Sequence, residues 1–537
     1  MKPNIIIFNP DQMRADALAH LGNPAALTPF LDQWAREEAV SFRRAFCQNP
    51  VCVPSRCSFA TGVYPHTHGH RTMRYMLHPG EPTLFQELKE AGYHVWVNAR
   101  NDLIAGQIPG LMEAHVSEIY CGGDHDPAPG PEENLRGEPG SKHFYSFYSG
   151  RLALDAHGRS YGSDDEDLDA AIDRIRHPVD GKPLCLFLGL TNPHPPYQVE
   201  EPYFSAVDRA KLPPRIDPAL DRGKPAMEAR IRVNQQLDQL TEADWDELRA
   251  CYLGMCMKVD AMFAKLCGAL KEAGIYDNTA IFFFSDHGDY TGDHGISEKS
   301  QNTFEDCLTN VPLLIKPPKG TAVDPGITDS LAELVDFYAT AMDYAGVAPN
   351  HTHFGRSLRP VVADRTQTVR DFVCCEGGRL PEELHCDEYH SVGDQVPKLH
   401  PYWPRMEAQT DPVAHGKATM LRTQQYKYIS RLEEPDEFYD LEADPLEQVN
   451  VIDDPAYAPA VIAMQRAMLR WYQATADTVP FAYDMRATPE MTWAKLKRQI
   501  PPAYEAEFRE KIARGANPFL LRNEVHRRFG SQKKQED

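Results

Sequence analysis

The segment NIIIFNPDQ, residues Asn4 to Gln12, joins a short apolar run directly to an acid and an amide. A continuous run of β-branched and aromatic residues of this length predicts a strand buried on both faces of a sheet. Similar runs follow along the chain at Tyr93–Val97, Leu184–Leu190, Ala280–Phe284 and Val311–Ile315. These segments together predict one large buried sheet.

Helical patterns separate the apolar runs. Pro82–Ala91 and Asp244–Ala273 are amphipathic, and the second pattern ends at Gly274. Alternation of strands and helices predicts an α/β domain whose sheet is largely parallel. After about residue 365 the pattern changes to shorter strands. We therefore divide the chain into a catalytic α/β domain (1–365), a smaller C-terminal subdomain with an antiparallel sheet (366–478) and a helical C-terminal extension (479–537).

Two stretches read as surface loops on their composition. Residues 122–140 are rich in Gly, Pro and Glu, and residues 379–416 are rich in Pro, His and aromatic side chains. The acidic run SDDEDLD at Ser163–Asp169 lacks the glycine of a calcium loop. It is typical of a helix start with acids in the first turn.

Polar residues follow three of the predicted strands at the point where each strand ends. Asp11 and Gln12 follow the first strand, His194 follows the third, and Asp286 and His287 follow the fourth. In open α/β sheets the ligand site lies beyond the carboxyl ends of the strands. The sequence therefore predicts that these side chains meet at one edge of the sheet.

The composition excludes several classes of partner. The formal net charge is −22, from 78 acidic and 56 basic residues, which is opposite to the bias of a nucleic-acid-binding protein. The apolar run near the N-terminus is shorter than the core of a signal peptide, and no stretch approaches the ~18 apolar residues of a membrane span. We expect a soluble cytoplasmic protein without nucleic-acid or membrane partners, in which most of the 12 cysteines are reduced core thiols.

The stretch NPVCVPSRCSFATG, residues Asn49 to Gly62, contains two cysteines whose role the residue types alone leave open. A zinc site lacks a second ligand pair at suitable spacing, and a disulfide is disfavoured by the expected compartment. A cysteine nucleophile would need a nearby histidine base, and ordinary buried packing is the commonest use of such a residue.

The same stretch carries a resemblance to a known family. Cys52-x-Pro54-x-Arg56, followed by Thr61 and Gly62, resembles the signature of the type I sulfatases, which belong to the alkaline phosphatase superfamily. Further family motifs follow in order: YPHTHGHR after Gly62, NPHPPY at Asn192–Tyr197, FSDHGDYTGDHG at Phe284–Gly295, Lys299, and EFYDLEADPLE near the C-terminus. The resemblance implies an alkaline phosphatase-like fold, with a large mixed, mostly parallel sheet sandwiched by helices.

In that family a separate enzyme, either a formylglycine-generating enzyme or an anaerobic sulfatase-maturating enzyme, oxidises the signature cysteine to Cα-formylglycine. The hydrated aldehyde attacks sulfur, the alcohol leaves, and collapse of the sulfated hemiacetal releases sulfate. By this resemblance Cys52 is the nucleophile precursor, and the chain is a sulfuric ester hydrolase.

The resemblance also implies a metal ion and a set of charged catalytic groups. One divalent ion, Ca²⁺ or Mn²⁺, is expected on Asp11, Gln12, Asp286, His287 and the converted Cys52, since hard oxygen ligands with one imidazole suit these ions. The expected catalytic side chains, besides Cys52, are a guanidinium that binds the nucleophile, a proton donor to the leaving alkoxide and two further cations: Arg56, His194, Lys299 and Arg100.

The chain departs from the common family pattern at two places. Gln12 stands where many sulfatases have a second aspartate. Arg100, Asn101 and Asp102 stand where many have Lys-x-His after a strand, so Arg100 replaces the lysine charge but Asp102 cannot donate a proton as a cationic histidine does. We expect Asn101 and Asp102 to face the substrate. The Asp-Gln and Asp-His pairing is similar to choline sulfatases, some carbohydrate sulfatases and phosphonate monoester hydrolases.

Three functional hypotheses therefore stand. The first is hydrolysis of a small anionic sulfate ester, with a sulfated sugar among the candidates. The second is hydrolysis of a phosphonate monoester or phosphodiester with the same nucleophile, and the third is a silent binding protein with an unmodified Cys52. Substrate specificity is expected from the loops, with Arg74, His415 and Lys417 as the substrate-binding candidates and further framing residues at His385, His400, Trp403 and Arg405. The helical C-terminus suits assembly into a homo-oligomer.

Overall fold

The computed structural model describes residues 2–123, 129–391, 397–481 and 485–530. Within these residues the largest sheet has nine strands in the order β11-β2-β10-β8-β1-β6-β3-β4, and β9 pairs with β2 beside this path. Its strands are β1 (Asn4–Asp11), β2 (Val40–Phe46), β3 (His94–Asn98), β4 (Glu118–Tyr120), β6 (Leu184–Pro193), β8 (Thr279–Phe284), β9 (Asn310–Val311), β10 (Leu313–Lys316) and β11 (Gly326–Glu333).

The sheet is mixed and mostly parallel. β1 lies between β6 and β8 and is parallel to both, and β3 continues the parallel pairing on the β6 side. β10 is antiparallel to β8 and to β2. Because β1, β6 and β8 run in the same direction, their carboxyl ends lie at one edge, as the sequence predicts.

Alternate residues of the central strands pack into two separate cores, one on each face of the sheet. Ile5 and Ile7 of β1 belong to one core, whereas Ile6 and Phe8 belong to the other. This two-sided burial explains why the strands read as continuous apolar runs rather than as alternating ones.

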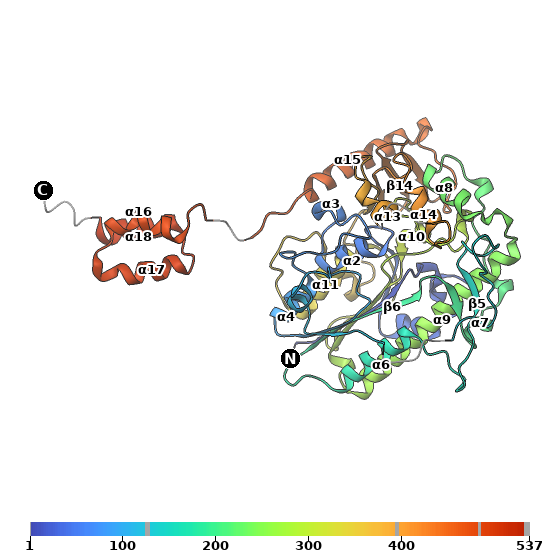
Figure 1. Ribbon diagram of the computed structural model, residues 1–537, viewed down its shortest axis with the longest axis horizontal. Coiled ribbons are helices and arrows are strands. Elements are labelled where there is room, and N and C mark those ends of the chain that lie inside the picture. Colours follow the sequence, from blue (N-terminus) through green and yellow to red (C-terminus); the bar gives the residue numbers. More distant parts are fainter. Residues whose placement is uncertain (1, 124–128, 392–396, 482–484, 531–537) are drawn as a thin grey trace. The chain divides into compact units, whose positions relative to one another are not determined.

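Helices cover both faces. On the Ile5 face lie α2 (Cys52–Thr61), α4 (Leu84–Glu90) and α11 (Val335–Ala345), and on the Ile6 face lie α1 (Pro29–Glu37), α6 (Ser163–Arg176) and the long α9 (Glu242–Glu272). Figure 1 shows α2, α4 and α11 on one side of the sheet and α6 and α9 on the other. The predicted α/β sandwich of the alkaline phosphatase type is confirmed.

A second, smaller sheet follows in the chain. It is antiparallel, in the order β12 (Val373–Gly377), β13 (Ala418–Arg422), β14 (Tyr426–Arg431) and β15 (Glu437–Asp440). Apolar side chains of this sheet share a core with α15 (Ala458–Thr475). The expected small antiparallel sheet in the C-terminal region is confirmed.

The chain forms two compact units, residues 1–478 and 479–537. Both sheets belong to the first unit. The second contains α16 (Pro489–Leu496), α17 (Glu505–Ala513) and α18 (Pro518–Phe529), which enclose an apolar core of their own.

Several local predictions can be compared with the structure. The helices predicted at Asp244–Ala273 and Pro82–Ala91 are α9 and α4, and the acidic run begins α6 at Ser163. The prediction of an irregular loop over 379–416 is wrong in part, because α13 (Glu388–Ser391) and α14 (Trp403–Ala408) form there. Residues 392–396 of this stretch lie outside the described residues, and so do residues 124–128 of the other predicted loop.

Among the described residues, no helix is both long and apolar enough to cross a bilayer. The cysteines are free thiols, and most of them are buried.

Candidate active site

The carboxyl ends of β1, β6 and β8 bring the predicted site residues to one edge. Asp11 is the last residue of β1, and Asp286 and His287 follow β8 after Ser285. The Ser285 hydroxyl accepts a hydrogen bond from the Met13 amide at 2.7 Å, which ties the two strand ends together. A Cβ atom on Gly288 would lie 2.0 Å from the Cys307 carbonyl oxygen, so only glycine lets these two backbone segments lie this close together.

Helix α2 carries Cys52 to the same place. Val51 is the N-cap, so Cys52 is the first residue of the helix, and every residue of α2 is buried. The Ser55 hydroxyl donates to the Asp286 carbonyl at 2.6 Å and joins the start of α2 to the end of β8. The two cysteines of the signature are therefore not equivalent, because Cys57 packs into the core beneath the sheet.

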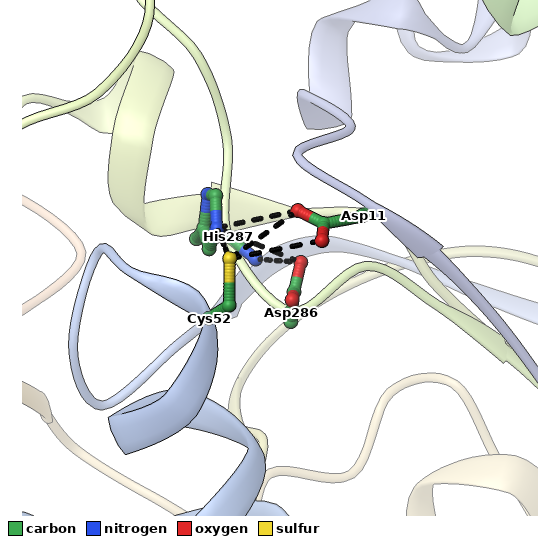
Figure 2. A group of neighbouring side chains, drawn as sticks. All are labelled: Asp11, Cys52, Asp286 and His287. Atoms are coloured by element: carbon green, nitrogen blue, oxygen red, sulfur yellow. Dashed lines mark hydrogen bonds and ion pairs between the residues drawn. The ribbon is translucent and has the colours of Figure 1, made fainter. Parts of the chain in front are cut away.

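Four side chains form a compact group of possible metal ligands. Asp11, Cys52, Asp286 and His287 each offer one ligand atom, and these atoms all lie within 4.8 Å of one another. Figure 2 shows all four pointing toward a common centre. Cys52 Sγ lies 3.2 Å from His287 Nε2 and 3.6 Å from both carboxylate oxygens of Asp11. All four residues are buried, so the group is screened from bulk water.

The orientation of His287 fits a metal ligand. Its Nδ1 lies 2.9 Å from the Gly288 carbonyl oxygen, which can only accept a hydrogen bond. Nδ1 must therefore carry the proton, which leaves the lone pair of Nε2 directed at the group. Burial lowers the pKa of His287, so the ring is neutral at neutral pH, as metal binding requires.

Arginine side chains neutralise the two carboxylates. Arg56 Nε donates to Asp286 Oδ2 at 2.8 Å and its Nη2 donates to Asp11 Oδ2 at 3.0 Å. Arg100 Nη2 also donates to Asp11 Oδ2, at 2.6 Å. Burial would raise the pKa of Asp11, but the nearby charges of Arg100, Arg56 and Lys299 outweigh it and hold that pKa well below its usual range. Asp11 can therefore stay ionised inside the protein.

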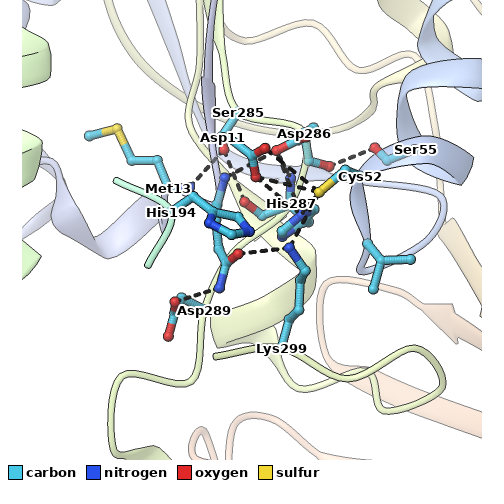
Figure 3. A network of polar contacts seen from close by, with 12 residues as sticks. Asp11, Met13, Cys52, Ser55, His194, Ser285, Asp286, His287, Asp289 and Lys299 are labelled. Carbon is cyan, nitrogen blue, oxygen red and sulfur yellow. Dashed lines mark hydrogen bonds and ion pairs between the residues drawn. The ribbon is translucent and has the colours of Figure 1, made fainter. Parts of the chain in front are cut away.

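Lys299 supplies a third cation (Figure 3). Its Nζ lies 3.3 Å from Cys52 Sγ and 2.9 Å from Gln12 Oε1. Gln12 itself adopts φ of 69°, in the left-handed region. Its Nε2 donates to Asp289 at 2.6 Å, so Asp289 fixes the amide with the oxygen facing Lys299.

Cys52 is poorly suited to act as an ordinary thiolate. Burial and then the negative charge of Asp11 raise the pKa of its thiol far above neutrality, and Lys299 only partly opposes this. A thiol nucleophile needs the reverse, a lowered pKa. The environment at this position is instead suited to a group that binds a cation.

His194, after β6, faces the same site in Figure 3. Its Nδ1 lies 2.7 Å from the Pro195 carbonyl oxygen, which again places the proton on Nδ1 and leaves Nε2 with a lone pair. Burial and the nearby charge of Lys299 hold the pKa of His194 well below its usual value. The ring is therefore neutral in this state.

A pocket of about 460 Å³ opens over Cys52. Among the predicted residues, it is lined by Cys52, Arg74, Arg100, Asp102, His194 and Lys299. Asn101 does not line it, since its side-chain oxygen accepts hydrogen bonds from the backbone amides of Leu103 and Ile104.

The structure places His415 and Lys417 elsewhere. His415 is fully buried and its Nε2 contacts Gln301 Oε1 at 2.5 Å, whereas the Lys417 amide donates to the Arg379 carbonyl. Neither residue lines the pocket. They were selected because they lie in a segment expected to be a loop, and that position does not determine which way a side chain points.

Among the pocket residues that the sequence did not single out are Glu388 of α13 and Tyr402, which immediately precedes α14. Of the expected framing residues, His400 and Arg405 line the pocket, whereas His385 and Trp403 do not. Arg405 Nη1 donates to Glu298 at 2.5 Å and its Nη2 donates to Glu388 at 2.7 Å. Glu298 precedes Lys299 and lies 3.5 Å from its Nζ. An arginine 107 residues away in the sequence thus holds the residue next to Lys299.

A buried ligand group at the carboxyl edge of a mixed sheet, surrounded by arginine and lysine, is the arrangement that the sulfatase resemblance predicts. The family model described as Sulfatase matches residues 3–347. The chain therefore belongs to the sulfatase family, and by class it is a sulfuric ester hydrolase.

Three similar proteins illustrate the range of the match. An arylsulfatase of Clostridium perfringens is 24% identical over 514 residues, covering 88% of this chain and 94% of the relative. The crystal structure of a phosphonate monoester hydrolase of Agrobacterium radiobacter matches with a TM-score of 0.67 at 22% identity, covering 90% of this chain and 98% of that one. A structure of BT4656 in complex with its substrate D-glucosamine-2-N,6-O-disulfate matches with a TM-score of 0.65 at 18% identity, covering 88% and 98%.

Proposed function

We propose that this protein hydrolyses sulfate monoesters with a formylglycine nucleophile made from Cys52, beside one divalent ion, Ca²⁺ or Mn²⁺. The observation that carries the proposal is the group formed by Asp11, Asp286 and His287 around the Cys52 side chain. The thiol stands where the oxygens of the hydrated aldehyde would lie.

The donor set fits such an ion. Two carboxylates and one imidazole are buried together, and the His287 tautomer leaves its lone pair free for the ion. Gln12 can join the set, because an amide oxygen has a second lone pair besides the one that accepts from Lys299. When bound, the ion would supply Lewis-acid polarisation and a lowered pKa for the nucleophile.

The side chains of the chain itself bind and orient the substrate anion. Arg56 is fully buried and pairs with both Asp11 and Asp286, so it holds the two carboxylates in place. Arg100 and Lys299 line the pocket and present their charges to a sulfate group above Cys52.

His194 is proposed to manage the proton at the leaving oxygen. Its Nε2 has a free lone pair and can accept a proton within the pocket. The negative charge of a bound sulfate would raise the pKa of His194 and favour the protonated ring, which can then donate to the departing alkoxide.

The leaving group is proposed to be a small polar alcohol, with a sulfated sugar as the leading class. The pocket volume of about 460 Å³ accommodates a monosaccharide sulfate. Tyr402 offers an aromatic face, and Arg74, Asp102 and His400 offer polar groups around it. This combination suits a ring that carries several hydroxyl groups.

Conversion of Cys52 requires a maturating enzyme, and burial limits when that enzyme can act. Cys52 is 2% exposed, and the whole of α2 is buried. We therefore propose that the formylglycine-generating or anaerobic sulfatase-maturating enzyme modifies the chain before α2 packs.

The test is a comparison of kcat/KM for an aryl sulfate, a sulfated monosaccharide, choline sulfate, an aryl phosphodiester and a phenyl phosphonate. Sulfate esters should be turned over fastest. Much faster turnover of the phosphodiester or phosphonate would replace the proposal with a phosphonate monoester hydrolase. Peptide mass spectrometry of protein from the native host should show converted Cys52, and an unconverted, metal-free and inactive protein would favour a binding role.

A further inference from the structure

Two buried side chains lie behind the catalytic group without reaching the substrate space. Asp289 stands two residues after His287, and Tyr197 begins β7 (Tyr197–Val199) at the end of the NPHPPY stretch. Both side chains are 0% exposed. Neither lines the pocket over Cys52, so any effect they have on the reaction must pass through other residues.

The hydrogen bonds of Gln12 leave one orientation for its amide. Nε2 donates to Asp289 Oδ2 at 2.6 Å, and Oε1 accepts from Lys299 Nζ at 2.9 Å. A carboxylate only accepts and an ammonium only donates, so a half-turn of the amide would set donor against donor and acceptor against acceptor. Figure 3 shows Asp289 and Lys299 at the two ends of this chain of contacts. Asp289 therefore decides that the amide oxygen faces Lys299, which lies 3.3 Å from Cys52.

The Tyr197 hydroxyl joins Asp289 to the backbone before Lys299. It lies 2.8 Å from both carboxylate oxygens of Asp289, to which it donates, and it accepts from the Glu298 amide at 3.1 Å. The Thr291 amide also donates to Asp289, at 2.6 Å. Glu298 has φ of 71°, so the backbone that leads to Lys299 lies in the left-handed region and needs a fixed support.

We propose that Asp289 and Tyr197 are positioning residues of the site. Asp289 turns the Gln12 oxygen toward Lys299 and the proposed ion, and Tyr197 holds both Asp289 and the backbone next to Lys299. An amide oxygen can bind a cation and an amide nitrogen cannot, so the orientation of Gln12 decides whether it can join the ligand set. The inference rests on the ion of the proposed function, but its first test does not.

The first test exchanges the two partners. In Asp289→Asn, the new amide oxygen keeps the Tyr197 and Thr291 donors, so its NH2 group faces the NH2 group of Gln12. In Gln12→Glu, two carboxylates face each other. In the double variant, the Asn NH2 group faces a carboxylate, and Lys299 keeps an acceptor.

Melting temperatures of the metal-free proteins measure this exchange. Asp289→Asn and Gln12→Glu should each melt several degrees below the unaltered protein, and the double variant should melt above either single variant, because the partners are coupled. A double variant that melts below both single variants would overturn the proposal.

Ion affinity separates a positioning role from support of the fold. Calorimetric titration with Mn²⁺, or with Ca²⁺ where the unaltered protein binds it more tightly, should give a dissociation constant about 10- to 100-fold higher in Asp289→Asn, the usual effect of removing a residue that orients a ligand. If the unaltered protein binds neither ion, the proposed ion is wrong, and the melting temperatures alone decide the role of Asp289.

The matched control is Tyr290→Phe. Tyr290 is 0% exposed and follows Asp289 in the chain, but its hydroxyl contacts Thr303 and Glu305 and does not reach Gln12. Tyr290→Phe should lower the melting temperature and leave the affinity for the ion unchanged. Equal affinities in Asp289→Asn and Tyr290→Phe would overturn the proposal.

If the double variant does not fold, Tyr197→Phe decides, since it removes a single oxygen atom. The Glu298 amide then loses its acceptor, so hydrogen-exchange mass spectrometry of peptides that span residues 296–301 should show faster exchange than in Tyr290→Phe. Equal exchange in the two variants would overturn the proposal. Melting and exchange are measured without substrate, so failure here would not count against sulfate hydrolysis, and absence of sulfate turnover would not count against the positioning role.

Discussion

At the scale of single residues, the two signature cysteines have different surroundings. Cys52 lies 3.2 Å from His287 and 3.3 Å from Lys299, whereas Cys57 packs among apolar side chains below the sheet. We predict that Cys52→Ala lowers kcat by about a thousandfold or more, because it removes the nucleophile. Cys57→Ala should keep kcat and cost about 1 kcal/mol of stability. Initial rates on an aryl sulfate and urea unfolding measure the two effects, and similar activity losses would contradict the distinction.

Arg405 is expected to affect catalysis indirectly, through the residues that position Lys299. Arg405 bonds both Glu298 and Glu388, and Glu298 lies beside the Lys299 ammonium. Glu298 adopts φ of 71°, so its position is strained and needs support. We predict that Arg405→Gln lowers kcat about 10- to 100-fold through misplacement of Lys299, and that Arg405→Lys restores part of the loss.

The matched control is Arg379→Gln. Arg379 is also fully buried in the 379–416 stretch, but it contacts Asp387 and does not line the pocket. It should lower the melting temperature with little change in kcat. If both variants lose stability alike and neither loses kcat, Arg405 has only a structural role.

Residue types in a fixed local pattern predicted the centre of the site. Asp11, Asp286 and His287 follow apolar strands, so their position at strand ends was sufficient to predict that they meet at one edge. Cys52 and Arg56 were identified by the resemblance to the sulfatase signature, which is also a short local pattern. The Arg405–Glu298 pair joins segments far apart in the chain, and no local pattern marks it. His415 and Lys417 were selected by local position alone, and their surroundings are set by tertiary packing.

At the scale of elements, the long helix α9 supports the start of α1. The Asp260 carboxylate of α9 accepts from the amides of Phe30 and Leu31, where α1 has unpaired donors. Burial raises the pKa of Asp260 to about 6, although these two hydrogen bonds oppose the rise. Because the folded pKa exceeds the unfolded one, the folded state binds more protons between about pH 4 and pH 6.

We therefore predict that Asp260 makes the protein less stable as the pH rises through that window, by about 3 kcal/mol in total. In Asp260→Asn this contribution disappears. The slope of the free energy of unfolding against pH should therefore be more positive between pH 4 and pH 6 than in the unaltered protein. Urea unfolding at a series of pH values gives the two slopes. Identical slopes would mean that Asp260 does not titrate in this range.

Element types were predictable where periodicity is strong. The 31-residue helix α9 begins and ends within two residues of its predicted bounds, because an amphipathic pattern and Gly274 both mark it. Helices α13 and α14 were missed because each is too short to show a period. Those short helices line the pocket over Cys52, so the pocket wall is the part of the site that the sequence predicts least well.

At the scale of the whole molecule, the large and small sheets are joined by a buried ion cluster. Arg370, which precedes β12, contacts Glu333 at the end of β11 at 2.6 Å and donates to Asp336 at 2.7 Å. Glu333 in turn accepts from the Cys374 amide in β12. Glu333 and Asp336 are 0% exposed, so Arg370 balances two carboxylates that water cannot reach.

We predict that Arg370→Met lowers the free energy of unfolding by about 3–5 kcal/mol, because it leaves buried carboxylates without a cation. Since Arg370 joins the two sheets within the compact unit 1–478, the loss should reach both. Amide hydrogen exchange should therefore quicken by a similar factor in β1 and in β14. Faster exchange in β14 alone would show that residues 366–478 unfold as a separate subdomain, with a boundary near residue 365.

Arg370→Met with Glu333→Gln, which removes one of the unpaired charges, should recover part of the stability if electrostatics and not packing is the cause.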